Sequence, residues 1–95
     1  MNTKIIEKLR ELKPILKEKY GIEEFAVFGS VARGDDNQNS DIDIVVIKVK
    51  EKNYFHLLDI IYFLREKLQK KIDMGYYDSI RPFIRKRIKK NLIYI

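Results

Sequence analysis

The chain has 95 residues and no cysteine. Its length predicts a single domain spanning residues 1–95, which buries roughly 60 to 65% of the surface that the unfolded chain exposes. The absence of cysteine excludes disulfides and thiolate metal sites, and the lone His56 would need several carboxylates to form a zinc site. No apolar run approaches the ~18 residues of a membrane span, and no secretion signal is recognisable. We therefore expect a cytoplasmic protein with no membrane partner.

The net charge of +6 predicts an acidic partner, which could be a nucleotide, a nucleic acid or an acidic protein surface. Lysine and arginine dominate residues 65–90, whereas residues 34–43 carry carboxylates and neither lysine nor arginine. An acidic pocket in a basic protein is typical of a metal site that receives polyphosphate.

The first predicted element is an amphipathic helix over residues 3–20. Apolar residues recur in it at helical spacing, namely Ile5, Leu9, Leu12 and Leu16. Asn2 or Thr3 can cap its start and Gly21 can end it. Pro14 removes one backbone hydrogen bond, so we expect a kink or a split there.

The next elements are predicted to form two strands around a short connection. Residues 24–28 form a buried strand, residues 30–33 a helical turn and residues 34–39 a polar loop. The second strand, over residues 41–49, is the clearest in the chain because nearly all its apolar residues are β-branched.

A second helix over residues 53–70 is predicted from its apolar spacing. Its expected inner face consists of Tyr54, Leu57, Leu58, Ile61, Leu64 and Leu68. A short third strand over residues 71–76, interrupted by Gly75, and a third helix over residues 79–92 follow. The third helix aligns Ile80, Ile84 and Ile88.

The predicted order of helix, strand, strand, helix, strand and helix indicates an α/β (α+β) fold. We expect a small mixed sheet of about three strands with helices packed mainly on one face. Residues 91–95 are consistent with either a strand or a tail.

Two aspartates in the second strand are the strongest candidates for a metal site. Because alternate side chains of a strand share a face, Asp41 and Asp43 project together with α-carbons about 6.5 Å apart. Magnesium prefers oxygen ligands and usually takes one or two carboxylates plus substrate phosphates, and paired sites hold two ions. Asp73, central in the third strand, is costly to bury unpaired and is the candidate third carboxylate.

The turn before these aspartates can bind phosphate. Gly29 ends a strand and permits close backbone approach, while Ser30 offers a hydroxyl and a helix-start amide. Arg33, one turn further, can reach the same anion. A Gly-Ser pair and an Asp-x-Asp pair are weak signals separately, but their order of phosphate turn, loop and carboxylate strand is much more specific.

The full pattern resembles the signature of the DNA polymerase beta nucleotidyltransferase superfamily. In chain order it consists of Gly29-Ser30, Ala32-Arg33-Gly34, Ser40 and Asp41-Ile42-Asp43. The short length is similar to that of the minimal nucleotidyltransferases, the MNT or MntA-like group, so this resemblance implies a nucleotidyltransferase fold. Arg33 and Ser40 join Gly29 and Ser30 as candidate nucleotide-binding residues.

The resemblance also implies roles for the matching residues. Asp41 and Asp43 would bind two Mg²⁺ ions, Gly29 and Ser30 would hold the triphosphate of ATP, and Asp73 would complete the metal site. Asp73 would also help to deprotonate the acceptor hydroxyl, which attacks the α-phosphorus with loss of pyrophosphate.

The acceptor is implied by the family rather than by composition. Minimal nucleotidyltransferases similar to this chain are antitoxins that adenylylate a tyrosine of a HEPN-type ribonuclease toxin. Larger members of the superfamily append a domain that grips the acceptor, and this length leaves no room for one. We therefore expect a partner chain, such as a HEPN-type toxin, or a homo-oligomer to hold the acceptor.

Other functions stay open. The chain could be a non-enzymatic partner- or RNA-binding module, or a nucleotidyltransferase acting on a small molecule or an RNA end. Phe55, Tyr62 and Phe63 on the second helix are expected to cover sheet edges, with a subunit or toxin surface as the alternative. His56 is expected to be a solvated surface residue.

The third helix carries the densest basic cluster, composed of Arg81, Arg85, Lys86, Arg87, Lys89 and Lys90. A solvated face or a surface for an acidic partner is favoured there over nucleic-acid binding. Arg81 and Arg87 border the inner face, where either could assist nucleotide binding. Tyr76 and Tyr77, expected at the site end of the third strand, are candidates for stacking on adenine, with core packing as the favoured alternative.

Overall fold

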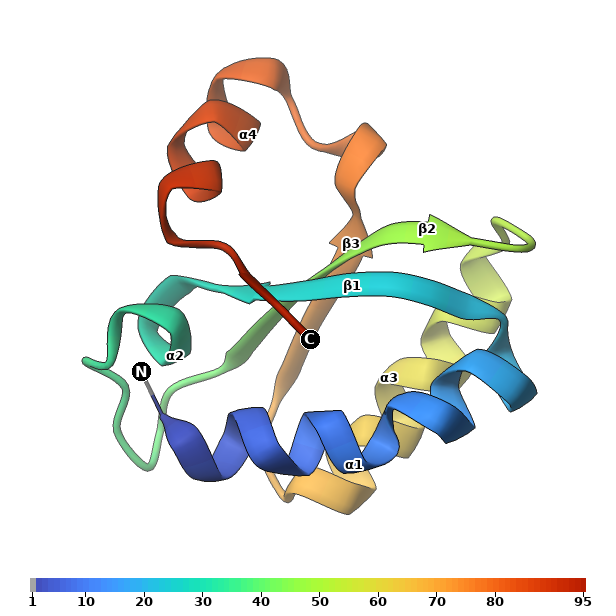
Figure 1. The fold of residues 1–95 in the computed structure, drawn as a ribbon, viewed down its shortest axis with the longest axis horizontal. Coiled ribbons are helices and arrows are strands. Elements are labelled where there is room, and N and C mark those ends of the chain that lie inside the picture. Colours follow the sequence, from blue (N-terminus) through green and yellow to red (C-terminus); the bar gives the residue numbers. More distant parts are fainter. Residues whose placement is uncertain (1) are drawn as a thin grey trace.

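The computed structural model describes residues 2–95. Its elements in chain order are α1 (Thr3–Tyr20), β1 (Ile22–Phe28), α2 (Gly29–Arg33), β2 (Ile42–Val49), α3 (Tyr54–Leu68), β3 (Ile72–Tyr76), α4 (Pro82–Ile88) and β4 (Ile93–Tyr94). Short 3₁₀ turns cover Tyr77–Ser79 and Lys89–Asn91. The predicted α/β class with a mixed sheet is confirmed (Figure 1).

Helix α1 has the predicted bounds and caps. The Ile5 backbone N–H donates to the Asn2 side chain at 3.2 Å, and Gly21 ends the helix in the left-handed conformation. The predicted split at Pro14 is wrong, because α1 is one uninterrupted helix. Pro14 is exposed while Leu12 and Leu16 on either side are buried, so core packing holds the helix together where one backbone bond is missing.

The sheet contains four strands in the order β3-β2-β1-β4, one more than predicted. Strand β2 pairs parallel with β3, and β1 pairs antiparallel with both β2 and β4. The additional strand forms where Ile93 and Tyr94 pair with Val27 and Ala26. Two residues are too few to show the alternation by which a strand is recognised in a sequence.

Helices α1 and α3 lie together on one face of the sheet (Figure 1). Ile42, Ile44 and Val46 of β2 belong to the hydrophobic core that these helices cover. Because side chains alternate along a strand, Asp43 lies on the opposite face. The face opposite the core carries the candidate site at Asp43, next to the buried pair of Ala26 and Val45.

Helix α3 presents most of the predicted face to the core, since Leu57 and Leu64 are buried and Ile61 and Leu68 pack against the core. Its buried residues are Leu57, Ile60 and Leu64. Tyr54, expected inside, is exposed. The helix is apolar on most of its circumference, so hydrophobic spacing alone does not settle its rotation.

The aromatic residues of α3 divide between two environments. Phe63 packs against the ring of Tyr20 with centroids 5.5 Å apart, and His56, expected to be solvated, is half-buried with its ring 5.6 Å from the same tyrosine. Phe55 and Tyr62 are exposed to 78% and 63%. These two side chains do not cover a sheet edge and are available to a partner.

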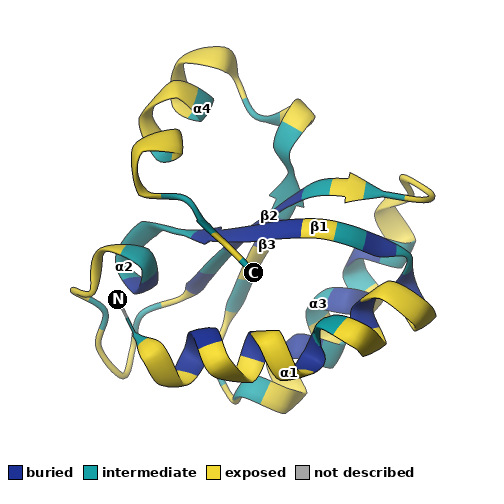
Figure 2. Cartoon of the chain, viewed as in Figure 1, coloured by how far each residue is buried: buried dark blue, intermediate teal, exposed yellow. Residues whose placement is uncertain are grey.

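Helix α4 begins at Pro82, later than predicted, because proline is favoured in the first turn and cannot continue a preceding helix. It lies on the other side of the sheet from α1 and α3, and its surface is largely exposed (Figures 1 and 2). Within residues 2–95, no helix is both long and apolar enough to cross a bilayer.

We expect Leu64→Ala to lower the free energy of unfolding by about 2 to 5 kcal/mol, because Leu64 is fully buried between α3 and the sheet. Arg65→Ala, on the exposed side of the same helix, serves as the control and should change it by less than about 0.5 kcal/mol. Urea denaturation measures both values. Equal effects of the two substitutions would contradict the placement of this helix.

Candidate functional site

The two sequence motifs meet at one cavity of about 480 Å³, here called the carboxylate cavity. It is lined by Gly29, Ser30, Arg33, Asn39, Ser40, Asp41 and Asp43. Six of the seven predicted site residues are therefore brought together. The seventh, Asp73, lies on the neighbouring strand β3, where it is the direct pairing partner of Asp43.

Gly29 lies close to the Asp43 side chain in the lining of this cavity. Strand β1 ends opposite Asp43, through the pair Phe28 and Asp43, and the chain then turns into α2. Gly29 has φ of 71°, and a β-carbon at this position would overlap the Oδ2 atom of Asp43. Only glycine therefore satisfies both the backbone conformation and the space beside the carboxylate.

Asp43 lies in an acidic environment. Partial burial, followed by the nearby charges of Asp73 and Asp41, raises the pKa of its carboxyl group above the ordinary value of 3.8, while Arg33 acts in the opposite direction. Without a bound cation, the ionised form of Asp43 is therefore disfavoured.

The donor set fits a divalent cation that is shared with phosphate. Among residues 2–95, no group of three or more acidic, histidine or cysteine side chains is arranged to hold a metal ion without other ligands. Magnesium commonly takes one or two protein carboxylates and completes its shell with phosphate oxygens and water. Asp41 and Asp43 supply such a pair, and a cation would relieve the repulsion from Asp73 and Asp41 that adds to burial in raising the pKa of Asp43.

The loop between α2 and β2 shapes the rim of the cavity. The Ser40 hydroxyl accepts a hydrogen bond from the Asn37 N–H at 2.9 Å, and the Ser40 N–H donates to the Asn37 carbonyl at 3.1 Å. Lys70 also donates to this carbonyl, at 2.9 Å. Asn39, which sequence reasoning missed, lines the cavity from the same loop, and its only signal is its position between the two motifs.

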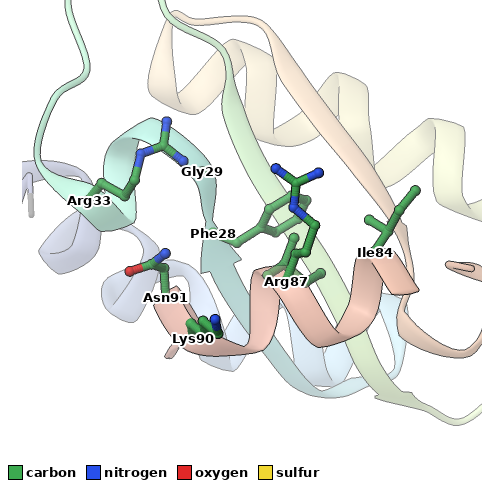
Figure 3. Close-up of a pocket in the computed structure, with 8 residues that line it drawn as sticks. Phe28, Gly29, Arg33, Ile84, Arg87, Lys90 and Asn91 are labelled. Atoms are coloured by element: carbon green, nitrogen blue, oxygen red, sulfur yellow. The ribbon is translucent and has the colours of Figure 1, made fainter. Parts of the chain in front are cut away.

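A second cavity of about 560 Å³, here called the α4 cavity, adjoins the first and shares Gly29 and Arg33 with it (Figure 3). Its lining is Phe28, Gly29, Arg33, Ile84, Arg87, Ile88, Lys90 and Asn91. Of the two arginines that could assist nucleotide binding, Arg87 lines this cavity, whereas Arg81 is the exposed N-cap residue of α4. Most of these lining residues were not predicted from the sequence, because helical periodicity does not show which part of the protein α4 faces.

Tyr76 is not at the site end of β3, contrary to the prediction. Since β2 and β3 are parallel, Asp73 pairs with Asp43 near the start of both strands, and Tyr76 pairs with Val46 further along. The Tyr76 hydroxyl instead bonds the backbone of Asn53 and anchors the start of α3, at 3.2 Å to the N–H and 3.1 Å to the carbonyl. Tyr77 is half-buried, with the Arg85 guanidinium 5.7 Å from its ring centre.

Residues 9–95 match the sequence profile of the nucleotidyltransferase domain family. The chain is 41% identical to a protein of Methanocaldococcus jannaschii named as a candidate protein adenylyltransferase, over 98% of this chain and 96% of that protein. It is 28% identical to the protein adenylyltransferase MntA of Thermococcus cleftensis, over 87% and 84% of the two chains.

Solved structures share the fold. A structure described as a candidate minimal nucleotidyltransferase superposes with a TM-score of 0.80 at 25% identity, covering 98% of this chain and 95% of the other. A toxin–antitoxin structure with AMP-PNP superposes at 0.70 and 22% identity, covering 98% of this chain and 70% of that one.

We expect Gly29→Ala to lower the free energy of unfolding by at least roughly 1 to 2 kcal/mol, the cost of a left-handed conformation for a residue with a side chain. The overlap with Asp43 adds to this cost. Gly75→Ala is the matched control, since a β-carbon at Gly75 meets no atom within 4 Å. A Gly29→Ala protein as stable as the Gly75→Ala protein would refute the close contact.

We expect Asp43→Asn to raise the melting temperature at pH 7 in metal-free buffer. Because folding raises the pKa of Asp43, its contribution to stability is complete below pH 3.8 and is lost as the pH rises through the folded pKa. The advantage of the asparagine variant should therefore disappear below about pH 4. Added Mg²⁺ should stabilise the wild type more than the variant. Melting curves across pH test this, and a less stable variant at pH 7 without metal would contradict it.

Proposed function

Since the chain belongs to the nucleotidyltransferase domain family, we propose that it transfers AMP from ATP to a hydroxyl group of a partner protein. The observation that carries the proposal is the carboxylate cavity, which joins Gly29 and Ser30 to Asp41 and Asp43. Phosphate binding and cation binding are thereby adjacent, as nucleotidyl transfer requires.

The residues of the carboxylate cavity and the neighbouring Asp73 have different roles in the proposed reaction. Gly29 and Ser30 bind the triphosphate, and the guanidinium of Arg33 adds positive charge beside it. The acceptor oxygen forms a bond to the α-phosphorus, the bond to pyrophosphate breaks, and the acceptor proton passes to a carboxylate. Asp73 is suited to take that proton because it is exposed beside Asp43.

Asp41 and Asp43 would hold Mg²⁺, with Asp73 completing the site. When bound, the ions neutralise charge on the phosphates and on the departing pyrophosphate. The carboxylates also keep the reactive face of the sheet acidic within a basic protein, so that phosphate enters only together with a cation.

A protein acceptor is supported by the relatives and by the surface. The M. jannaschii and T. cleftensis relatives carry the names of protein adenylyltransferases, candidate in the first case. Tyr54, Phe55 and Tyr62 form an exposed aromatic surface on α3 that a partner could cover. We propose a tyrosine of a HEPN-type toxin as the acceptor, which makes this chain the antitoxin of the pair.

One observation favours a second candidate function. The exposed basic residues of α4 suit RNA, so a contact module of the same fold or transfer to an RNA end is the alternative. Phosphate-driven RNA binding must weaken steeply as the salt concentration rises.

Incubation with α-labelled ATP, Mg²⁺ and a HEPN-type protein of the same genome should transfer label to the partner. Asp41→Ala and Asp43→Ala should each reduce the rate by about 100-fold or more, because cation binding is lost. Asp78→Ala removes an exposed carboxylate that is paired with Lys52 outside the cavity, and it should leave the rate unchanged.

Labelled partner in undiminished amount with both site variants would refute the assignment of these carboxylates. If no partner is labelled and anisotropy detects salt-sensitive RNA binding, the contact-module alternative replaces the transferase.

A further inference from the structure

We propose that the α4 cavity binds the adenine base of the nucleotide and that Asn91 distinguishes adenine from guanine. This inference rests on the proposed function, since it assigns the other half of the same substrate. The α4 cavity and the carboxylate cavity share Gly29 and Arg33, so a ligand can pass from one into the other without leaving the protein surface.

The two adjoining cavities can hold the triphosphate and the nucleoside of one nucleotide separately. With the triphosphate beside Ser30 and Asp43, the nucleoside must leave the carboxylate cavity on one side. The α4 cavity, of about 560 Å³, opens on the side where Gly29 and Arg33 lie. This volume falls within the range of small-molecule sites in proteins, roughly 300 to 1,000 Å³.

The lining of the α4 cavity is apolar where a base would lie. Phe28 at the end of β1 provides an aromatic ring, and Ile84 and Ile88 of α4 provide aliphatic surface. Ile84 is 39% exposed, and it belongs to a helix that has no buried residue. A planar base between these side chains would cover apolar surface that the fold alone leaves open.

Arg87 adds a second planar group to the cavity (Figure 3). A guanidinium stacks on aromatic planes as well as pairing with anions, whereas a lysine ammonium supplies only charge. Arg87 is thus suited to cover one face of the base.

Asn91 provides the group that can read the edge of the base. It lies at the end of the 3₁₀ turn after α4, and its amide is directed toward the side of the cavity where Arg33 lies (Figure 3). An asparagine amide offers one acceptor and one donor, which match the N6 donor and N7 acceptor of adenine. Guanine presents two acceptors at the same edge, so only one of them can be satisfied.

Three cations also border this cavity, namely Arg33, Arg87 and Lys90. A cavity for phosphate alone would need these charges but not Phe28, Ile84 and Ile88. The apolar side chains therefore favour a base over a second anion. Inorganic tripolyphosphate, which has no base, distinguishes these two ligands in a binding experiment.

The test is a calorimetric titration of the full chain with ATP, GTP and tripolyphosphate in the presence of Mg²⁺. For Asn91→Ala we expect the Kd of ATP to rise about tenfold, the preference for ATP over GTP to fall, and the Kd of tripolyphosphate to stay constant. Arg87→Lys keeps the positive charge and removes the planar guanidinium, so it should weaken the binding of ATP but not that of tripolyphosphate. Lys86→Ala, elsewhere on α4, is the control and should leave all three values within about twofold.

The outcomes separate this inference from the proposed function. ATP binding that is lost in Asp43→Ala but unchanged in Asn91→Ala and Arg87→Lys would overturn the base site and leave the transferase intact. Equal losses of ATP and tripolyphosphate in the α4 variants would show that the cavity binds phosphate, which also overturns it. If the wild type binds neither ligand, both proposals fall.

Discussion

The contact between Gly29 and the carboxylate of Asp43 is the constraint on which the rest of the site depends. Phe28 and Asp43 are neighbours across the β1–β2 pair, so the chain must turn into α2 directly beside a charged side chain. A residue without a β-carbon and with positive φ permits that turn. The turn at Gly29 and Ser30 and the strand that carries Asp43 are consequently held against each other by backbone pairing.

Helix α1 and the core that it covers support this contact. Asn2 caps α1 through its side-chain oxygen. Its side-chain amide donates to the Asp36 carboxylate in the loop before β2 at 2.8 Å, and its backbone N–H donates to the Val31 carbonyl of α2 at 3.1 Å. The core beneath the sheet fixes β2, so Asp43 has little freedom to move away from Asp73. Partial burial, together with the resulting repulsion, raises the pKa of Asp43 and disfavours its ionised form when no cation is bound.

Prediction from the sequence succeeded where the signal was local. The caps of α1 were read from Asn2 and Gly21, and the β-branched run identified β2 to within one residue. It was incomplete where long-range packing decides between near-equal choices. The burial of Ile60 in place of Tyr54 on α3, the absence of a split at Pro14 and the choice of a strand for residues 93–94 all depend on partners distant in the sequence. The site divides in the same way, since six of its predicted residues lie on one stretch of chain, whereas the α4 lining comes from another.

The sequence by itself determined which residues carry the proposed chemistry. Glycine, serine and two aspartates at fixed spacing need only one turn and one strand to meet, and those are local structures. The tertiary structure alone decided that Asp73 stands beside Asp43, that Tyr76 lies away from the site, and that α4 closes a second cavity over Phe28. The parallel pairing of β2 with β3 and the return of the chain after Pro82 set these positions, and both depend on burial of the whole core, which no short segment encodes.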